Sequence, residues 1–541
     1  MTDRQSIPRI RHEFKGIISD SPKAINFLGF DGKNYWIPRS ICTLIKEKKG
    51  MVVATLAVFK FEEITGITAE PLTTSFVSLG GEVMERHQAP TCNLIESKTT
   101  PLLPAQRSRV ERALASRYMA LLCEAGTGKT LMSLTVAYSR RRAGLVNNIV
   151  VMCPASLQQQ WKDLANEYFP GISIDVFSIH SASYEESLER IKQKYYSNGG
   201  VTQLIVDEVH LCRNQSAKRS RNIEKSFSAD YCMILTAFPI ERNAGDLFYQ
   251  FGIMDRAIIG EENYHQFQKK FLLLGGNDGE TVVAYQNTEE LAQRINPYIV
   301  RLTKKEVAPS LPAKQYHEVY FDMSENQLRA YSAINNLMAQ YEWLPKNKSY
   351  QFGTLCQKLA SGYVPTDAEL ESIFGNLGKL GDGATNVARI AGIGYDSDNA
   401  RLKAFQSVME QIDGQAVIWC NYIDEMNAVR EVLPNSEVIN GENTHDRDRH
   451  IARFKAGELQ YLIISVAINE GFNLQNACHA VFYSDTYSRT KAENAADRIH
   501  RIGQDRLCHI WRLMARRSLD ERIRRVRERK AKICNVFDLE A

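Results

Sequence analysis

The chain has 541 residues, of which 44% are hydrophobic and 24% charged, with a formal net charge of +4. This length exceeds the roughly 250–300 residues at which single cores stop growing, so we expect several domains of an ordinary globular protein. The net charge is too small to indicate a partner by itself, and the eleven cysteines form no C-x-x-C pair, which argues against zinc ribbons and iron–sulfur ligation. The start of the chain lacks the apolar stretch of a secretory signal, and no run approaches the roughly 20 apolar residues that span a bilayer. We therefore predict a cytoplasmic protein without membrane contacts.

Residues 1–100 differ in pattern from the rest of the chain. Short strand-like runs recur at 24–30, 35–37 and 51–59, with Gly and Asp between them, and Asp31-Gly32 is a plausible hairpin turn. The pattern predicts a small β-rich module, whose residues do not indicate its role.

Alternation of apolar strands and helices characterises the remainder. Strands are predicted at 120–123, 148–153, 203–206 and 231–235, and again at 416–420, 437–439, 461–465 and 480–483. Such alternation predicts parallel sheets with helices on both faces. We expect an α/β protein with two doubly wound lobes, at 101–300 and 406–541, joined by a linker and helical insertion at 301–405.

A glycine-rich loop follows the first of these strands. Gly126, Thr127, Gly128, Lys129 and Thr130 stand between a buried strand and the start of a helix. Glycines let backbone N–H groups surround phosphate oxygens, the lysine supplies a positive charge, and the threonine hydroxyl suits Mg²⁺. The helix also directs the positive end of its dipole at the loop. The pattern therefore predicts a nucleotide–Mg²⁺ site.

Two further motifs complete the predicted chemistry. Asp207 and Glu208 follow an apolar strand, where the aspartate is suited to holding Mg²⁺ and the glutamate to polarising the attacking water. His210 either couples the nucleotide to neighbouring segments or is a structural histidine. Arg498 and Arg501 are three residues apart, hence expected on one helical face, and across a cleft they would stabilise the transferred phosphoryl group.

These residues together resemble superfamily-two helicases, and within them the Swi/Snf-like ATPases. The resemblance runs from about Leu102 to Arg529 and includes Leu103-Pro-Ala-Gln106, Cys153-Pro-Ala-Ser156, Leu235-Thr236-Ala237-Phe238-Pro239, Arg301-Leu-Thr-Lys304 with Leu311-Pro312-Ala-Lys314, and Arg498-Ile-His-Arg501-Ile-Gly503-Gln504. It implies RecA-like lobes with ATP between them and duplex nucleic acid across their surface. It also implies that Gln106 reads adenine and that Gly471 belongs to the nucleotide site. With the compact length, it favours a bacterial or phage protein.

Three positions and one stretch depart from the Swi/Snf-like pattern. Cys123 stands where the family usually has aspartate, Phe238 where it has threonine, and Asn494 where it has glutamine. The stretch Glu470 to Leu474 is closer to superfamily two in general. These changes leave the ATPase residues intact but weaken the prediction of a chromatin-remodeller role.

The resemblance and the polar strand ends together suggest nucleic-acid contacts. The candidates are polar or aromatic side chains of the two lobes: Ser156, Gln160 and Trp161 in the first, and Asn421, Ser465 and Asn473 in the second. Trp161 is also the kind of residue that fills a core. The basic run from Arg506 to Lys530 suits a phosphate backbone or a solvated amphipathic helix.

Three functions remain open on the sequence alone. The first is an ATP-driven translocase on double-stranded DNA. The second is a strand-separating or branch-migrating helicase at forks or recombination intermediates, with residues 1–100 reading the structure, or a motor on RNA. The third is a nucleic-acid-binding protein with a decayed ATPase, which Phe238 supports and the intact Lys129, Asp207, Glu208, Arg498 and Arg501 oppose.

Overall fold

The computed structural model describes the strands within residues 9–57, and residues 86–183, 194–195, 200–213, 222–223, 229–275, 281–340, 346–363, 399–468 and 472–536. The chain forms two compact units, Met1–Glu85 and Arg86–Ala541. The second unit contains both predicted lobes.

The first unit is built from two antiparallel sheets of three strands. One sheet has the order β1 (Arg9–Phe14), β6 (Met51–Ala57), β5 (Cys42–Lys48), and the other has the order β2 (Gly16–Asp20), β3 (Ala24–Leu28), β4 (Asn34–Pro38). The β-rich prediction is confirmed, although this unit ends at Glu85, before the predicted boundary at residue 100. The predicted turn at Asp31-Gly32 lies outside the described residues.

The first lobe of the second unit is a six-stranded parallel sheet. Its order is β14 (Ile299–Leu302), β7 (Tyr118–Cys123), β11 (Tyr231–Thr236), β10 (Thr202–Val206), β8 (Asn148–Cys153), β9 (Asp175–Ser178). The two central strands, β10 and β11, are buried along their whole length, as expected for strands covered on both faces. The helices of this lobe are α3 (Pro104–Leu114), α4 (Lys129–Arg142), α5 (Gln158–Tyr168), α8 (Asp246–Gly252), α9 (Arg256–Ile259), α10 (Tyr264–Phe271) and α11 (Thr288–Ile295).

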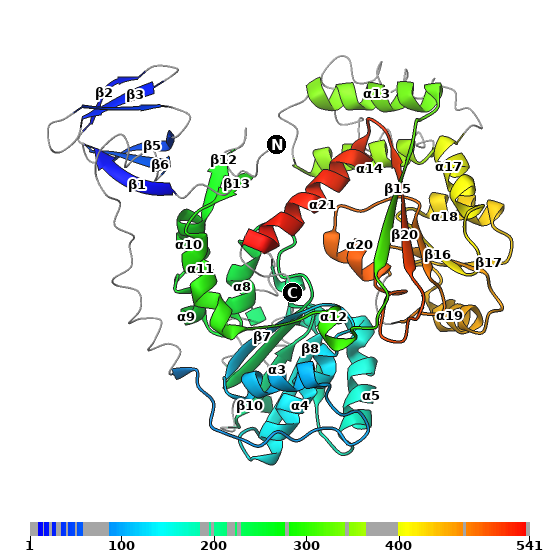
Figure 1. Cartoon of the computed structure of the whole chain (residues 1–541), viewed down its shortest axis with the longest axis horizontal. Coiled ribbons are helices and arrows are strands. Elements are labelled where there is room, and N and C mark those ends of the chain that lie inside the picture. Colours follow the sequence, from blue (N-terminus) through cyan, green and yellow to red (C-terminus); the bar gives the residue numbers. More distant parts are fainter. Residues whose placement is uncertain are drawn as a thin grey trace. The chain divides into compact units, whose positions relative to one another are not determined.

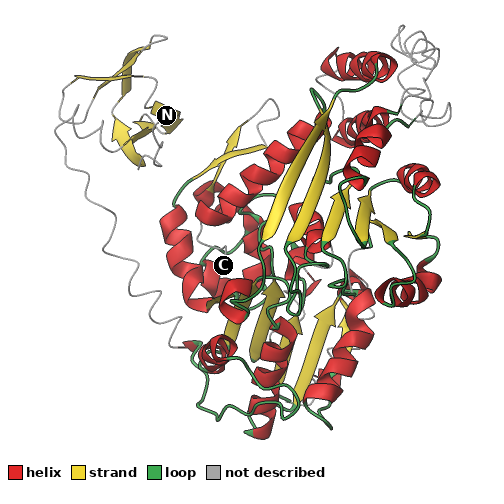
Figure 2. Ribbon diagram, turned by 45° about the vertical axis from the view of Figure 1, so that its right-hand side comes forward, coloured by secondary structure: helices red, strands yellow, loops and turns green. Residues whose placement is uncertain are grey.

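The second lobe repeats this plan with another six-stranded parallel sheet. Its order is β15 (Lys314–Phe321), β20 (Cys508–Ala515), β19 (His479–Phe482), β16 (Ala416–Cys420), β18 (Tyr461–Ser465), β17 (Ser436–Ile439). Its helices are α17 (Ala400–Met409), α18 (Ile423–Val432), α19 (Arg447–Lys455) and α20 (Arg489–Ala496). Helices cover both faces of each sheet (Figure 2), so the predicted α/β fold with two doubly wound lobes is confirmed.

The segment between the lobes combines a short turn with longer helices. α12 (Lys304–Val307) follows β14, and α13 (Glu325–Gln340) and α14 (Lys346–Ala360) follow β15. A small hairpin of β12 (Leu272–Gly275) and β13 (Thr281–Tyr285) belongs to the first lobe. Helices are thus present within the linker and helical insertion predicted at 301–405, and residues 364–398 lie outside the described part.

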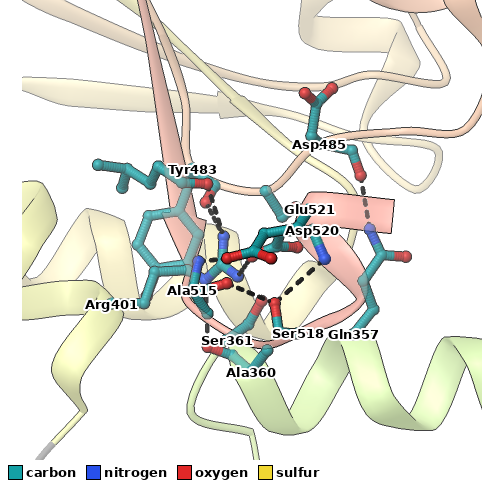
Figure 3. A network of polar contacts seen from close by, with 12 residues as sticks. Gln357, Ala360, Ser361, Arg401, Tyr483, Asp485, Ala515, Ser518, Asp520 and Glu521 are labelled. Atoms are coloured by element: carbon teal, nitrogen blue, oxygen red, sulfur yellow. Dashed lines mark hydrogen bonds and ion pairs between the residues drawn. The ribbon is translucent and has the colours of Figure 1, made fainter. Parts of the chain in front are cut away.

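A long final helix, α21 (Leu519–Val536), connects the two lobes. It begins beside α14, runs toward α8 (Figure 1), and carries Leu519 in a core of the second lobe and Ile533 in a core of the first. Its start is fixed by a fully buried ion pair in which Arg401 Nη2 lies 2.5 Å from Asp520 Oδ2 (Figure 3). The same guanidinium donates to the carbonyl oxygen of Tyr483 at 2.6 Å, so buried charge is matched by hydrogen bonds.

Within the part of the chain that the structure describes, no helix has the length and apolarity needed to cross a membrane.

Candidate nucleotide site between the two lobes

The glycine-rich loop joins β7 to α4, as predicted. Gly126 and Gly128 adopt φ values of +82° and +88°, which L side chains rarely adopt. A Cβ atom on Gly128 would also collide with the side-chain amide of Gln106. The loop therefore requires glycine at both positions, and it precedes a helix of 14 residues. Free backbone N–H groups at such a helix start suit a phosphate group.

Lys129 and the two threonines lie where the loop turns into α4. The Lys129 ammonium lies 2.8 Å from the carbonyl oxygen of Cys123 and 3.1 Å from that of Glu124, so its charge is held over the loop. The Thr127 hydroxyl donates to the same Glu124 oxygen at 2.8 Å, and Thr130 is half-buried in the first turn of α4. This arrangement fits a triphosphate with Mg²⁺ beside Thr130.

Gln106 is fixed against this loop from α3. Its Nε2 donates to the Thr127 carbonyl oxygen at 2.8 Å, and its Oε1 accepts from the Leu103 backbone N–H at 2.9 Å. The side chain is buried, so these bonds hold it rigidly beside the loop. Its contact with adenine stays a prediction.

Asp207 and Glu208 leave the carboxyl end of β10 next to this loop. Asp207 Oδ2 accepts from the indole N–H of Trp161 at 3.0 Å, and Oδ1 accepts from the Glu208 backbone N–H at 2.9 Å. Burial, followed by repulsion from Glu208, raises the pKa of Asp207 to about 7. A carboxylate poised in this way would be kept ionised by a divalent cation, which fits the predicted Mg²⁺ role.

Glu208 has the opposite balance. Its backbone has φ +50°, in the left-handed region that is costly for a residue with a side chain. Burial alone would raise its pKa, but a hydrogen bond from His210, with the charges of Lys129 and Arg498, lowers the pKa below its usual value. The two neighbouring carboxyl groups thus differ in proton affinity, which is compatible with the predicted role of Glu208 as the base.

His210 connects Glu208 to the strand end that follows. Its Nδ1 lies 3.1 Å from Glu208 Oε2 and 3.2 Å from the hydroxyl oxygen of Thr236. Thr236 in turn accepts from the Phe238 backbone N–H at 3.1 Å. The segment Leu235–Pro239 therefore still contributes one hydroxyl, that of Thr236, to these contacts, although Phe238 has none.

Arg498 and Arg501 approach this site from the second lobe. The Cγ atom of Arg501 lies 3.7 Å from the position of a Cβ on Gly126, and the charge of Arg498 acts on Glu208. The prediction that both lie on one helical face is wrong, since α20 ends at Ala496 and the arginines occupy the turns after it. The turns thus bring the Arg501 side chain beside the loop, whereas Arg498 Nη1 donates to the carbonyl oxygen of Phe472 in the second lobe at 2.9 Å.

The predicted nucleic-acid residues of the second lobe are largely engaged within the protein. Asn473 Oδ1 accepts from Arg501, so this amide supports the arginine. The amide of Asn421 donates to Ser484 Oγ and to the carbonyl oxygen of Asp485, both at 2.9 Å. Ser465 is buried and its hydroxyl accepts from the Ala467 N–H. Gly471 lies outside the described residues.

In the first lobe the three candidates separate. Ser156, in the turn before α5, and Gln160, in the first turn of α5, are exposed. Trp161 is only 2% exposed, and its indole N–H serves Asp207. Its assignment to nucleic acid is therefore corrected: the side chain fills the core and supports the carboxylate.

Two residues important to this site had weak or no sequence signals. Glu124 stands two residues before Gly126, and its carboxylate accepts from the Lys304 backbone N–H at 2.6 Å. Glu241 accepts from the Ser488 hydroxyl at 2.7 Å and the Thr490 N–H at 3.1 Å, so the first lobe caps α20 of the second. Position beside a motif signals Glu124, but no local pattern signals Glu241.

The basic run after Arg506 is partly structural. Arg512 and Arg527 lie 2.9 and 2.6 Å from the carboxylate oxygens of Asp485, and Arg524 lies 2.9 Å from Glu318. The remaining arginines of this run within the described residues are partly or wholly exposed, and they include Arg516, Arg517, Arg522, Arg525 and Arg529. The surface charge available to a phosphate backbone is therefore smaller than the sequence suggests.

The described part of the chain contains no cluster of three or more His, Cys, Asp or Glu side chains able to hold a metal ion. A Mg²⁺ ion bound with a nucleotide takes few protein ligands and shares the rest among phosphate and water. Thr130 and Asp207 are the residues that would hold it, and when bound it would neutralise charge on the phosphates.

Comparison with known proteins shows which domain families the lobes match. Residues 179–360 match the SNF2-related domain, 400–503 the helicase conserved C-terminal domain, and 99–241 the res subunit of type III restriction enzymes. The two matched lobes and the shared nucleotide site define a superfamily-two helicase. The chain belongs to its Swi/Snf-like branch of ATP-dependent helicases, which confirms the resemblance.

Similar proteins come from bacteria and animals. The chain is 24% identical to an uncharacterized ATP-dependent helicase of Mycoplasma pneumoniae, over 76% of this chain and 39% of that protein. It is 23% identical to the uncharacterized ATP-dependent helicase YqhH of Bacillus subtilis, over 74% and 72%. It is 25% identical to the mouse chromodomain-helicase-DNA-binding protein 1-like, over 76% and 47%. The chain thus spans less than half of two of these three relatives.

A solved structure of the Sulfolobus solfataricus SWI2/SNF2 ATPase core in complex with dsDNA aligns at 20% identity and a TM-score of 0.37. The alignment covers 80% of this chain and 92% of that chain.

Proposed function

We propose that this protein hydrolyses ATP to drive translocation along double-stranded DNA. The observation that carries the proposal is the division of the site between lobes: Lys129, Asp207 and Glu208 come from the first lobe, whereas Arg498 and Arg501 come from the second. Chemistry that needs both groups is sensitive to the distance between the lobes. A site of this kind converts hydrolysis into relative movement of the lobes.

The roles of the residues follow from their surroundings. Lys129 and the loop N–H groups bind the phosphates, and Glu208, held ionised, orients and polarises the attacking water. Arg498 and Arg501 stabilise the charge that develops on the transferred phosphoryl group, as positioned arginines do in this reaction. His210 and Thr236 connect the base to the segment that faces the second lobe.

Two observations support the choice of double-stranded DNA as the substrate: the family of the chain and the exposed polar and basic groups on its surface. Ser156, Gln160 and the exposed arginines of α21 offer contacts to a phosphate backbone that carry no sequence information. The chromodomain-helicase relative is named as a DNA-binding protein, which supports the choice of DNA.

The test is ATP turnover measured with no nucleic acid, duplex DNA, single-stranded DNA, forked DNA, four-way DNA and RNA. We expect the largest stimulation with duplex DNA, equal for linear and forked forms. Stimulation confined to forks or four-way junctions, and lost without residues 1–85, would instead favour strand separation or branch migration. Turnover that no nucleic acid changes would contradict a motor of any kind.

A further inference from the structure

A buried ionic cluster lies behind the nucleotide site, where the segment between the lobes meets the second lobe. Lys304 is the first residue of α12, and its ammonium lies 2.6 Å from Asp497 Oδ1. Asp497 directly precedes Arg498 in the sequence. Lys314, at the start of β15, lies 3.0 Å from the same oxygen. Lys304 and Asp497 are only 7% and 5% exposed. Charges buried to this degree need close partners, so the contact is specific.

The backbone of Lys304 is attached to the glycine-rich loop. Its N–H donates to Glu124 Oε2 at 2.6 Å, and the Glu124 N–H donates to the Leu302 carbonyl oxygen at 3.0 Å. The carbonyl oxygen of Glu124 is the one that receives Lys129 and Thr127. The start of α12 is therefore held to the first lobe at Glu124, two residues before the first loop glycine.

The side chain of Lys304 is attached to the arginine segment, residues 497–501. Its ammonium donates to the His500 carbonyl oxygen at 3.0 Å as well as contacting Asp497. The Asp497 carbonyl oxygen accepts from Arg501 Nε at 3.3 Å, and His500 Nε2 lies 2.7 Å from the Pro312 carbonyl oxygen. Lys304 thus holds both ends of the turn that carries Arg498 and Arg501.

The electrostatics keep the carboxylate of this contact ionised, whereas burial lowers the pKa of the Lys304 ammonium. Burial alone would raise the pKa of Asp497, but Lys314 and Lys304 hold it at about 2. Asp497 is therefore ionised across the physiological range. Lys314 already pairs with this carboxylate, and its contacts belong to the second lobe alone. Lys304 is the member that spans from the glycine-rich loop to the arginines.

We propose that Lys304 is a positioning residue, which sets Arg498 and Arg501 against the glycine-rich loop through Asp497 and the His500 carbonyl. This inference rests on the proposed ATP hydrolysis. Lys304 touches neither the loop glycines nor the arginine guanidinium groups, so it acts through its neighbours. Loss of its charge should displace the arginines while the phosphate-binding loop stays intact.

The experiment compares three substitutions in the full chain: Lys304→Met, Lys304→Arg and Lys305→Met. Methionine keeps the length without the charge, and arginine restores the charge beside a cavity of about 520 Å³ that gives it room. Lys305 is exposed and adjacent, so its substitution is the matched control. We expect Lys304→Met to lower kcat about tenfold to a hundredfold, as small misplacements of catalytic groups do, with KM and nucleotide affinity within about twofold. Lys304→Arg should recover most of kcat, and Lys305→Met should match the unsubstituted protein.

Each outcome bears on one claim. Absence of turnover in the unsubstituted protein overturns the proposed function, whereas turnover there with an unchanged kcat in Lys304→Met overturns the positioning role. The positioning role is also overturned if Lys304→Arg lowers kcat as much as Lys304→Met does, or if Lys304→Met mainly raises KM. Thermal unfolding shows whether Lys304→Met folds. If it does not, Asp497→Asn tests the same contact with an isosteric side chain, and an unchanged kcat there contradicts the proposal.

Discussion

The two lobes of the second unit share one architecture but present different chemistry to the site between them. Both are six-stranded parallel sheets covered by helices on both faces. The first lobe contributes a glycine-rich loop, a lysine and two carboxyl groups, all within the turns that follow its own strands. The second lobe contributes two arginines held by backbone and amide oxygens. Similar scaffolds thus divide one reaction, with nucleotide binding in the first lobe and completion of the site in the second.

The two lobes also differ in where the residues that hold their charged groups come from. In the first lobe, Asp207 is supported by Trp161 and Glu208 by His210, which are residues of the same lobe. In the second lobe, the turn that carries the arginines is held by Lys304, which is itself attached to Glu124. The carboxyl groups of the first lobe are therefore supported within that lobe. The arginine turn of the second lobe depends in addition on Lys304, a contact that crosses between the lobes.

The largest effect is expected from Lys129→Ala. Removal of the ammonium should abolish ATP turnover and weaken nucleotide binding strongly, because this charge faces the phosphates. Folding and nucleic-acid binding should be largely retained. Steady-state turnover and equilibrium nucleotide binding check this, with Arg142→Ala, at the exposed far end of the same helix, as the control. ATP turnover that survives Lys129→Ala would show that the glycine-rich loop does not bind the phosphates during hydrolysis.

Asp207→Asn should change the dependence of stability on pH. The pKa of Asp207 is raised to about 7 in the folded protein, above the roughly 3.9 of an unfolded aspartate. The folded state therefore binds this proton more tightly, and its stability falls as pH rises from about 4 to about 7. The pKa of Glu208 is lowered, so its contribution to stability is lost only as the pH falls below the pKa of a normal glutamate.

The measurement is thermal unfolding between pH 5 and 8 without divalent cations. We expect Asp207→Asn to be more stable than the unsubstituted protein at pH 8, with the gain shrinking toward pH 5, and to lose Mg²⁺-dependent turnover. A stability difference that does not vary with pH would contradict the raised pKa.

A smaller effect is expected from Trp161→Phe. Phenylalanine fills most of the same core space but cannot donate to Asp207, so turnover should fall severalfold, in line with loss of one hydrogen bond to a charged group. Affinity for nucleic acid should not change, because the side chain is buried. Binding of labelled duplex DNA checks this, with Gln160→Ala as the exposed comparison. Weaker DNA binding by Trp161→Phe alone would restore the original interpretation of this residue.

The sequence predicted the fold and the first lobe's contribution closely, since these depend on local patterns. The strands at 148–153, 416–420 and 461–465 have the predicted bounds. Within the two six-stranded sheets, the strands not predicted are β9, β14 and β15, at sheet edges, and β20, within the basic run. In the edge strand β15 only Phe321 is buried and the other residues are exposed or half-buried, which resembles a surface segment more than a core strand.

The supporting contacts could not be predicted because they join residues far apart in the chain. Glu241 reaches a residue 247 positions later, and Lys304 reaches one 196 positions later. The arginines of the basic run offered a local charge pattern, but their carboxylate partners, Asp485 and Glu318, lie on other elements. A charge run therefore indicated a nucleic-acid surface where the fold had partly neutralised it.

The measurement that tests the division between lobes most directly is ATP binding and ATP turnover in Arg501→Ala, both with saturating duplex DNA. The account predicts nucleotide affinity within about twofold of the unsubstituted protein and a kcat lower by about a thousandfold, the lower end of the effect known for such arginines. An unchanged kcat, or a loss of affinity that accounts for all of the lost turnover, would contradict it.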